Sequence, residues 1–545
     1  MPVRHLPEEI LILIYEELGR RRDFPTLFGC ALSSVSFSEP ALRTMYRINE
    51  QSPLITETDE LDQQESQLRK WALLWRSIIR SSLSATYKPY CLYIRSLNLD
   101  NLKDLLQEAR FSGKIEQDFF AGELQDFHFR TEQISTQPTK KRQKIRLVVD
   151  FMPILHAVGE AITKKTMLLQ ELRGPISKEF LPQWIRRLPR LQVLHLQQGH
   201  VLTAEAQNAI RENCPSFRSL ELYAWTEAKA DEHLAALLST TSGWQNFELY
   251  SGSDIGRMSL AAMNYHASTL SSIKLMGLND DAVRSLGCLK ECTALQKLEL
   301  EARSFVELED LENDAFLDIV AWLNNCCDLK ELALKNFRDG PAILAETLAT
   351  RKFTLTSLSL KKYIASGDKA VAFHAAISEQ LSLQKVYLNG DGEETTYEEL
   401  QMLVNALSRL SSLQVLDLNQ MSDNFTDHHI TTLALNLPRL ETFYPSGYAI
   451  TDSVFPALAG LKHLRDLQFC GVTHFTATGI GAFISTLDRT TNSGLFLSLW
   501  AVDRDHMLSS DEEAFMRELI NTRLDGRFWV TTWGEADSDF ESESD

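Results

Sequence analysis

The chain has 545 residues, of which 44% are hydrophobic and 24% charged, and its formal net charge is −19. This acidity excludes a general nucleic-acid binder, which needs a basic surface. No uncharged apolar stretch reaches roughly 18 residues, so we expect no transmembrane helix and no membrane partner, and the N-terminus does not have the pattern of a signal peptide. The eight cysteines include no CxxC pair, which is typical of an intracellular chain with reduced thiols, cytoplasmic or nuclear.

The first predicted element is a helix in "LPEEILILIYEEL", Leu6 to Leu18. Pro7 and the two glutamates after it favour a helix start. The five apolar residues Ile10 to Ile14 follow one another without a break. At about 100° per residue such a run goes right round the helix, so every side of it must be covered. The next fifty residues are too few and too polar to do this alone.

Two further short helices are predicted before Arg47. Asp23 is placed as an N-cap and Pro25 near a helix start. Apolar residues then recur at helical spacing, at Leu27, Phe28, Ala31, Leu32 and Val35, and after Ser38 at Leu42, Met45 and Tyr46. Three small helices in about 45 residues make a core that is too small to be stable without further contacts.

Residues 1–47 resemble the F-box. "LPEEILILIYEEL" is similar to the opening of that motif and "DFPTLFGCALSSVSF" to its second half, with Phe37 where the family often has Trp. The resemblance implies docking to a Skp-type adaptor, which links to a cullin–RING ubiquitin ligase and would cover the exposed side of the first helix. The implied contacts are Leu6, Pro7, Ile10, Leu11, Ile14, Leu18, Leu27 and Leu32. The alternative is that these residues are the core of a helical cap on the repeats described below.

Residues 48–67 are polar and acidic and predict a flexible linker. A helix is expected from Leu68 to Leu83, with Trp71 and Trp75 packing the N-terminal module against the first repeat. Residues 68–123 as a whole are predicted to form this linking helix and irregular first repeats.

Twelve stretches from Leu191 onward share the pattern LxxLxL, with apolar residues at positions 1, 4 and 6. They begin at Leu191, Phe217, Trp244, Leu270, Leu295, Leu329, Leu355, Leu383, Leu413, Leu440, Leu464 and Gly494. Weaker copies begin at Ile94, Leu124 and Leu169. A period in the mid-twenties with this pattern indicates leucine-rich repeats. It resembles the cysteine-containing repeats of the ribonuclease-inhibitor-like superfamily, with Cys214, Cys292 and Cys326 in one recurring position before the strand.

The predicted fold class is therefore α/β: a leucine-rich-repeat solenoid after a small all-α F-box. Each repeat contributes one strand and one helix, and neighbours stack into a horseshoe with parallel strands on the concave face and helices outside. The solenoid is placed at residues 124–505, a C-terminal cap at 506–534 and a disordered acidic tail at 535–545. The tail sequence "EADSDFESESD" is also a candidate for acid-directed phosphorylation at Ser538, Ser542 or Ser544.

Positions 3, 5 and 7 of each LxxLxL unit should face the concave side, because side chains alternate along a strand. Exposed aromatic residues are favoured anchors in protein recognition, and those at these positions are Tyr223, Tyr250, Tyr387, Tyr444 and Trp500. We expect them to contact a protein substrate.

The sequence predicts no enzyme and no cofactor. It lacks GxxxxGK[ST], GxGxxG, HExxH and GxSxG. A zinc site is a weak alternative for the cysteines, because they lie one repeat apart without paired spacing. The function indicated is the substrate-recognition subunit of an SCF-type ubiquitin ligase. The alternatives left open are a non-degradative F-box scaffold and a regulator built on the repeats alone.

Overall fold

The computed structural model describes residues 7–49, 61–134, 145–308, 314–391, 395–502 and 507–532. The chain divides into two compact units. Unit 1 comprises Met1–Ala230 and Thr240–Tyr250, and unit 2 comprises Asp231–Ser239 and Ser251–Asp545.

Unit 1 begins with a three-helix bundle, as predicted: α1 (Glu8–Arg20), α2 (Phe24–Ser33) and α3 (Val35–Arg47). Asp23 caps α2, its Oδ1 accepting the N–H of Thr26 at 3.0 Å, and Pro25 lies in the first turn. Apolar side chains from all three helices form the core, namely Leu11, Tyr15, Leu27, Ala31, Leu42 and Tyr46.

Helix α4 (Leu61–Ser82) begins inside the segment predicted to be a linker. That prediction is wrong from Leu61 onward, and residues 50–60 lie outside the described residues. Gln and Glu are good helix formers, so the polar composition that indicated flexibility also favours a helix. An ion pair one turn apart, Arg69 to Glu65 at 2.6 Å, supports the added turns.

The two tryptophans of α4 are buried packing residues, as expected. The indole N–H groups of Trp71 and Trp75 both donate to Oδ1 of Asn101, at 2.9 and 2.8 Å. Asn101 lies on α5 (Leu99–Gln107), which directly follows the first strand of the sheet. Helix α4 is thus fixed to the first repeat by the burial of both indole rings and by their hydrogen bonds to the side chain of Asn101.

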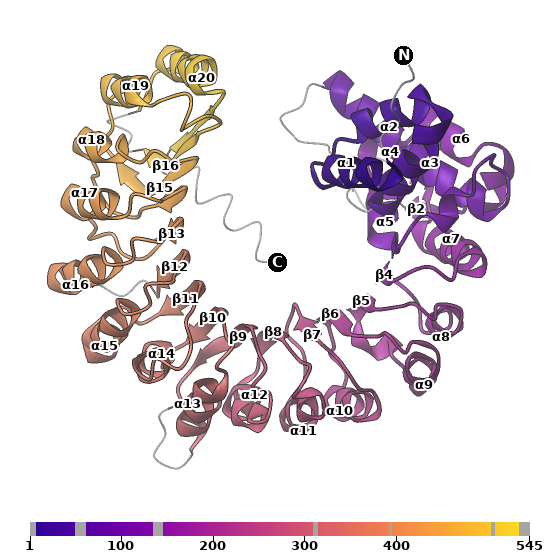
Figure 1. Cartoon of the computed structure of the whole chain (residues 1–545), viewed down its shortest axis with the longest axis horizontal. Coiled ribbons are helices and arrows are strands. Elements are labelled where there is room, and N and C mark those ends of the chain that lie inside the picture. The colour runs from indigo at the N-terminus through magenta and orange to yellow at the C-terminus, as the bar shows by residue number, and fades with distance from the viewer. Residues whose placement is uncertain are drawn as a thin grey trace. The chain divides into compact units, whose positions relative to one another are not determined.

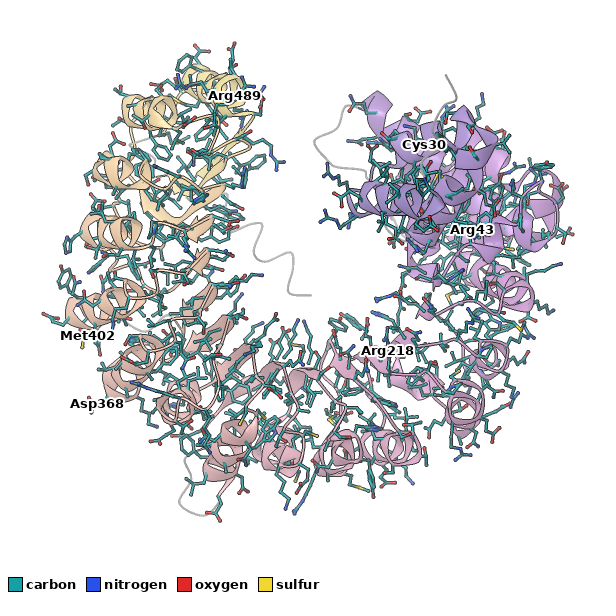
Figure 2. The ribbon with its side chains drawn as sticks, viewed as in Figure 1. Cys30, Arg43, Arg218, Asp368, Met402 and Arg489 are labelled. Carbon is teal, nitrogen blue, oxygen red and sulfur yellow. The ribbon has the colours of Figure 1, made fainter. Side chains whose placement is uncertain are left out.

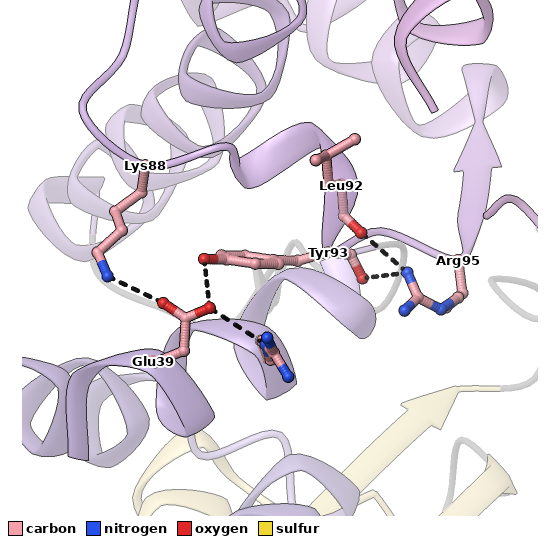
Figure 3. A network of polar contacts seen from close by, with 6 residues as sticks. Glu39, Lys88, Leu92, Tyr93 and Arg95 are labelled. Carbon is pink, nitrogen blue, oxygen red and sulfur yellow. Dashed lines mark hydrogen bonds and ion pairs between the residues drawn. The ribbon is translucent and has the colours of Figure 1, made fainter. Parts of the chain in front are cut away.

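The bundle is joined to the rest of unit 1 by a polar and aromatic contact (Figure 3). The carboxylate of Glu39 on α3 accepts from Lys88 Nζ at 2.9 Å and from the Tyr93 hydroxyl at 2.8 Å. Beside it, the ring of Tyr46 stacks on Tyr90 with centroids 4.6 Å apart.

The parallel sheet of unit 1 is built from β1 (Ser96–Asn98), β4 (Glu171–Gly174), β5 (Val193–Gln198), β6 (Ser219–Ala224) and β7 (Asn246–Leu249), paired in that order. Position 3 of each repeat is aligned with position 3 of the next. The associated helices are α7 (Phe151–Lys165), α8 (Leu181–Ile185) and α9 (Ala204–Asn213). The next helix, α10 (Ala230–Thr240), belongs to unit 2 through Asp231–Ser239.

The weak repeat predicted at Leu124 is wrong. β1 pairs directly with β4, so no strand position exists between them. The stretch "LQDFHF" instead falls in a 3-10 helix (Gly122–Phe127) after α6 (Lys114–Phe120), with Leu124 fully buried. An antiparallel hairpin, β2 (Arg130–Ile134) and β3 (Ile145–Val149), follows. The solenoid sheet thus starts at Ser96 rather than at residue 124.

Unit 2 continues the same architecture. Its strands are β8 (Ser272–Leu278), β9 (Lys297–Val306), β10 (Glu331–Phe337), β11 (Ser357–Tyr363), β12 (Lys385–Gly390), β13 (Val415–Asp417), β14 (Thr442–Tyr444), β15 (Asp466–Thr473), β16 (Phe496–Val502) and β17 (Arg527–Thr532). Its helices are α11 (Arg257–Ala262), α12 (Asp280–Arg284), α13 (Ala315–Asn325), α14 (Gly340–Ala349), α15 (Gly367–Ile377), α16 (Tyr397–Leu407), α17 (Asp427–Asn436), α18 (Phe455–Leu458), α19 (Ala477–Thr486) and α20 (Ser510–Leu524).

The strands of unit 2 are parallel and paired in chain order, again with the third positions of the repeats aligned. Within this unit the helices cover one side of the strands and leave the other side bare (Figure 1). Asp368 and Met402, labelled in Figure 2, lie on the helix side. β17 pairs with β16, so residues 507–532, within the predicted C-terminal cap, continue the sheet as a further repeat. The leucine-rich-repeat fold is confirmed.

The recurring cysteines tie neighbouring repeats together at the helix ends. Cys326 Sγ donates to the carbonyl oxygen of Cys292 at 3.6 Å, and Cys214 Sγ to that of Leu188 at 3.5 Å. Burial raises the pKa of each of these three thiols to about 12, so they stay protonated at neutral pH. Near the end of the array Asn492 likewise donates to the carbonyl oxygens of Leu461 and Leu464.

A buried histidine in α15 predicts acid sensitivity. His374 is 1% exposed, and its Nε2 lies 3.3 Å from the Tyr363 hydroxyl. Its Nδ1 has no hydrogen-bond partner among the described residues. Burial lowers its pKa to about 4, against an opposing effect of Glu399. Since the unfolded pKa is about 6.5, the folded state is fully stable above that pH and loses up to about 3 kcal/mol as the pH falls from 6.5 to 4.

We expect His374→Gln, which cannot become charged, to flatten this pH dependence of the urea midpoint. Phe373 and Met421 also contact this site but do not titrate. Exposed His463→Gln is the control and should leave the dependence unchanged. An unchanged slope in His374→Gln would show that other groups cause the acid sensitivity.

Candidate functional site

The N-terminal bundle presents an unusual number of apolar side chains to solvent. On α1, Ile10 is 42%, Ile12 40%, Leu13 60% and Ile14 42% exposed. Three more lie on α2 and α3, namely Phe28 at 51%, Leu32 at 71% and Val35 at 94% exposure. We call these seven residues the apolar surface of the bundle. Such exposure in a small module is typical of a protein-interaction site.

The structure divides the eight predicted adaptor contacts into several groups. Ile10, Ile14 and Leu32 belong to the apolar surface, Pro7 is exposed and Leu18 is half-buried. Leu6 lies outside the described residues. Leu11 and Leu27, at 9% and 0% exposure, were predicted as contacts but belong to the core of the bundle.

Four residues of the apolar surface were not predicted as contacts from the sequence, namely Ile12, Leu13, Phe28 and Val35. A run that is apolar all round the helix does not reveal which side faces inward. The signal was the pair Leu11 and Tyr15, four residues apart, which both face the core.

The bare side of the parallel sheet, which we call the open face, carries positions 3, 5 and 7 of each repeat. The predicted alternation is confirmed: in β10, Leu332 and Leu334 are buried, whereas Glu331, Ala333 and Lys335 are not. All five aromatic residues predicted to contact a substrate are at open-face positions and are at least partly exposed.

In unit 1 the open face holds two exposed tyrosines beside a charged cluster. Tyr223 is 55% exposed. The Tyr250 hydroxyl donates to Glu248 Oε2 at 2.5 Å, and its ring stacks on His195 with centroids 6.1 Å apart. These contacts hold Tyr250 in place before any partner binds, which reduces the entropy lost on binding.

The charged cluster is centred on Glu221. Its Oε2 lies 3.1 Å from Arg173 Nη1 and 3.0 Å from His195 Nδ1. Burial acts to raise the pKa of Glu221, but the hydrogen bond to His195 and the charge of Arg173 outweigh it, and the pKa is lowered. The carboxylate is therefore ionised at neutral pH.

In unit 2 the open face of β8 to β12 is rich in lysine. Ion pairs join Lys274 to Glu299 at 3.1 Å and Lys335 to Glu301 at 2.6 Å. A hollow of about 370 Å³ lies here, lined by Met276, Lys297, Glu299, Glu331, Ala333, Lys335, Ser357, Ser359, Lys361 and Tyr387 among others.

Further along unit 2 the open face becomes aromatic and acidic. Tyr387, Asp417 and Tyr444 are aligned on adjacent strands. The Tyr444 hydroxyl donates to Asp466 at 2.8 Å. Burial raises the pKa of Asp417. Trp500 Nε1 donates to Gln468 at 3.1 Å, so the aromatic side chains here are also held by neighbours.

Trp529 on β17 is an open-face aromatic that the sequence analysis missed. It is 52% exposed and aligned with Ser498. The repeat was overlooked because Asp525, with a left-handed φ of 52°, stands where the pattern has its first leucine. The alternation in "RFWVTT" was the available signal.

Neither a metal site nor a membrane span is found in the part of the chain that the structure describes. No group of three or more His, Cys, Asp or Glu side chains there could hold a metal ion. No helix among those residues is long and apolar enough to cross a bilayer.

Comparison with known proteins finds distantly similar solved structures. No family model and no curated protein sequence matches the chain. Among solved structures, the yeast Rad7–Elc1 complex contains a chain 18% identical, with a TM-score of 0.41, covering 65% of this chain and 86% of that one. An internalin of Listeria monocytogenes is 16% identical, with a TM-score of 0.34 and coverages of 59% and 89%. A chain of the TLR13–ssRNA13 complex is 13% identical, with a TM-score of 0.26, and the match covers 63% of this chain and 64% of that one. Likenesses this low bear on neither partner nor activity.

Proposed function

We propose that the chain is the substrate-recognition subunit of an SCF-type ubiquitin ligase. In this proposal residues 7–47 are an F-box that binds a Skp-type adaptor, and the open face of the repeats binds a protein substrate. The chain is then not itself an enzyme and needs no cofactor. A cullin–RING ligase, recruited through the adaptor, transfers ubiquitin, and the chain contributes by holding the substrate near it.

The apolar surface of the bundle carries this proposal. Its residues lie on a module whose own core is already complete, with Leu27 fully buried and Tyr15 2% exposed. The exposed side chains are therefore not needed to hold the three helices together. Burying a leucine or isoleucine side chain contributes about 1.5–3 kcal/mol, so several of them supply a strong docking energy for an apolar partner.

The attachment of the bundle also supports the proposal. Glu39, Tyr46, Tyr90 and Tyr93 fix α3 to the segment that leads into β1. Because the bundle is fixed to the first repeats of unit 1, an adaptor bound to it would be held in a defined orientation relative to those repeats. A substrate receptor requires such a fixed geometry.

Co-purification tests the proposal. The tagged chain, expressed in its native type of cell, should bring down both a Skp-type adaptor and a cullin. Recovery of the adaptor without the cullin would favour a non-degradative scaffold. Recovery of neither would overturn the proposal and leave the bundle as a cap on the repeats.

We expect the open-face aromatic residues to carry substrate binding. The double variant Tyr223→Ala/Tyr250→Ala in unit 1 and the triple variant Tyr387→Ala/Tyr444→Ala/Trp500→Ala in unit 2 test the two surfaces separately. Exposed aromatic anchors each contribute on the order of 1–2 kcal/mol, so at least one variant should lose most proteins crosslinked to the wild-type chain. Tyr265→Ala, on the helix side, is the control. Crosslinking unchanged in both variants would contradict this assignment.

A further inference from the structure

The lysine-rich part of the open face in unit 2 has an excess of positive charge in a chain that is strongly acidic. At the outward positions of β8 to β12 stand five lysines and three glutamates: Lys274, Lys297, Lys335, Lys361 and Lys385, with Glu299, Glu301 and Glu331. The chain as a whole carries −19. This surface is therefore a local exception to the charge of the molecule.

Two of these lysines, Lys361 and Lys385, form no ion pair with any residue that the structure describes. The charge of Lys361 nevertheless acts on the carboxylate of Asp417, where it opposes the effect of burial on the pKa. Lys361 instead lies over the ring of Tyr387, with Nζ 5.9 Å from the centroid. Lys361 is also aligned with Lys335 on the adjacent strand. Like charges in facing positions destabilise a sheet. The ion pair of Lys335 with Glu301 offsets part of this repulsion, and an anionic group bound across both lysines would offset the remainder.

The hollow at this place has the chemistry for carboxylate or phosphate groups. Small residues, Ala333, Ser357 and Ser359, leave the space, and the two serines add hydroxyl donors. Lys297 is nearly half exposed, and its only described carboxylate neighbour, Glu331, is 3.8 Å away. Met276 and Tyr387 also line the hollow and offer an apolar contact.

The C-terminal segment of the same chain has the complementary composition. Residues 535–545 read "EADSDFESESD", with six acidic residues, no basic residue and one phenylalanine, Phe540. They lie outside the described residues and follow β17 of unit 2 in the chain. The acidic groups match the lysines, and Phe540 matches the apolar contact beside them.

The segment is also long enough to reach this surface. From β17 to β9, the far edge of this surface, the sheet has eight strand spacings in the order of pairing. At about 4.8 Å each this is about 38 Å. Residues 533–545, which follow β17, span up to about 45 Å when extended.

We propose that the acidic C-terminal segment, residues 535–545, binds in cis to the lysine-rich open face formed by β9 to β12 and covers it. The segment then competes with any partner for this face. Phosphorylation of Ser538, Ser542 or Ser544 adds negative charge and strengthens the contact. The inference needs neither the adaptor nor a substrate, so its failure and that of the proposed function are distinguishable.

A peptide of residues 533–545, carrying a fluorophore, tests the proposal against the full chain and a chain ending at Thr532. The truncated chain should bind the peptide in a salt-sensitive manner. The full chain should bind it at least about tenfold more weakly, because a tethered segment acts at an effective concentration near 1 mM. Equal binding by both chains, or no binding by the truncated chain, would overturn the proposal.

Variants locate the contact. In the truncated chain, Lys297→Ser/Lys335→Ser/Lys361→Ser should abolish peptide binding. A matched triple variant of exposed lysines away from the open-face positions, Lys290→Ser/Lys352→Ser/Lys462→Ser, removes the same charge and should retain it. A peptide with Asn and Gln in place of Asp and Glu leaves the protein untouched and should not bind. Binding that survives the first triple variant, or the neutral peptide, would overturn the assignment.

Discussion

The double variant Leu13→Asp/Leu32→Asp should weaken binding of a purified Skp-type adaptor by at least about 100-fold, measured by titration calorimetry. Both side chains are strongly exposed, at 60% and 71%, so the bundle folds without them. Each replacement removes about 1.5–3 kcal/mol of apolar burial in the proposed complex and places a charge in its interface. The melting temperature of the free chain should not change.

A matched double variant separates this effect from general surface acidity. Leu317→Asp/Leu435→Asp alters two leucines of similar exposure, 63% and 68%, on α13 and α17 of unit 2. It should bind the adaptor as the wild type does. If Leu13→Asp/Leu32→Asp also stays within about threefold of the wild type, the apolar surface is not the docking site.

The repeats were predictable because the pattern repeats many times and each copy is locally complete. Position 3 of each unit, identified from the sequence alone, lies opposite position 3 of the next unit in the parallel sheet. The failures occurred where a repeat departs from the pattern. The stretch at Leu124 has apolar residues at the right spacing but forms a 3-10 helix, because β1 pairs directly with β4 and leaves no place for a strand between them. This strand pairing cannot be read from the local sequence.

The candidate sites were predictable only in part. Alternation along a strand identifies which side chains reach the open face, so Tyr223 and Tyr387 could be named in advance. Charge partners could not, because the pairing of Lys335 with Glu301 rather than with a solvent ion depends on register between strands. On α1, the apolar run left the inward side undetermined until Leu11 and Tyr15 were seen in the core.

The second large effect is expected in α4. Trp75→Ala should destabilise the start of the repeat array by about 3–5 kcal/mol, the usual cost of removing a buried tryptophan side chain. Trp75 is 1% exposed and its N–H donates to Asn101 at 2.8 Å. Its loss leaves a cavity between α4 and α5. Because repeats contact mainly their neighbours, the loss should be local rather than global.

Hydrogen exchange followed by mass spectrometry is the appropriate readout, since it locates a local loss of stability within the array. Peptides from α4, α5 and β1 should lose protection in Trp75→Ala, whereas peptides from β12 to β16 in unit 2 should keep theirs. Leu73→Ala, on the same helix but 62% exposed, should change protection little. A uniform loss of protection through β16 would contradict nearest-neighbour stacking, and it would mean that the N-terminal contacts stabilise the whole array.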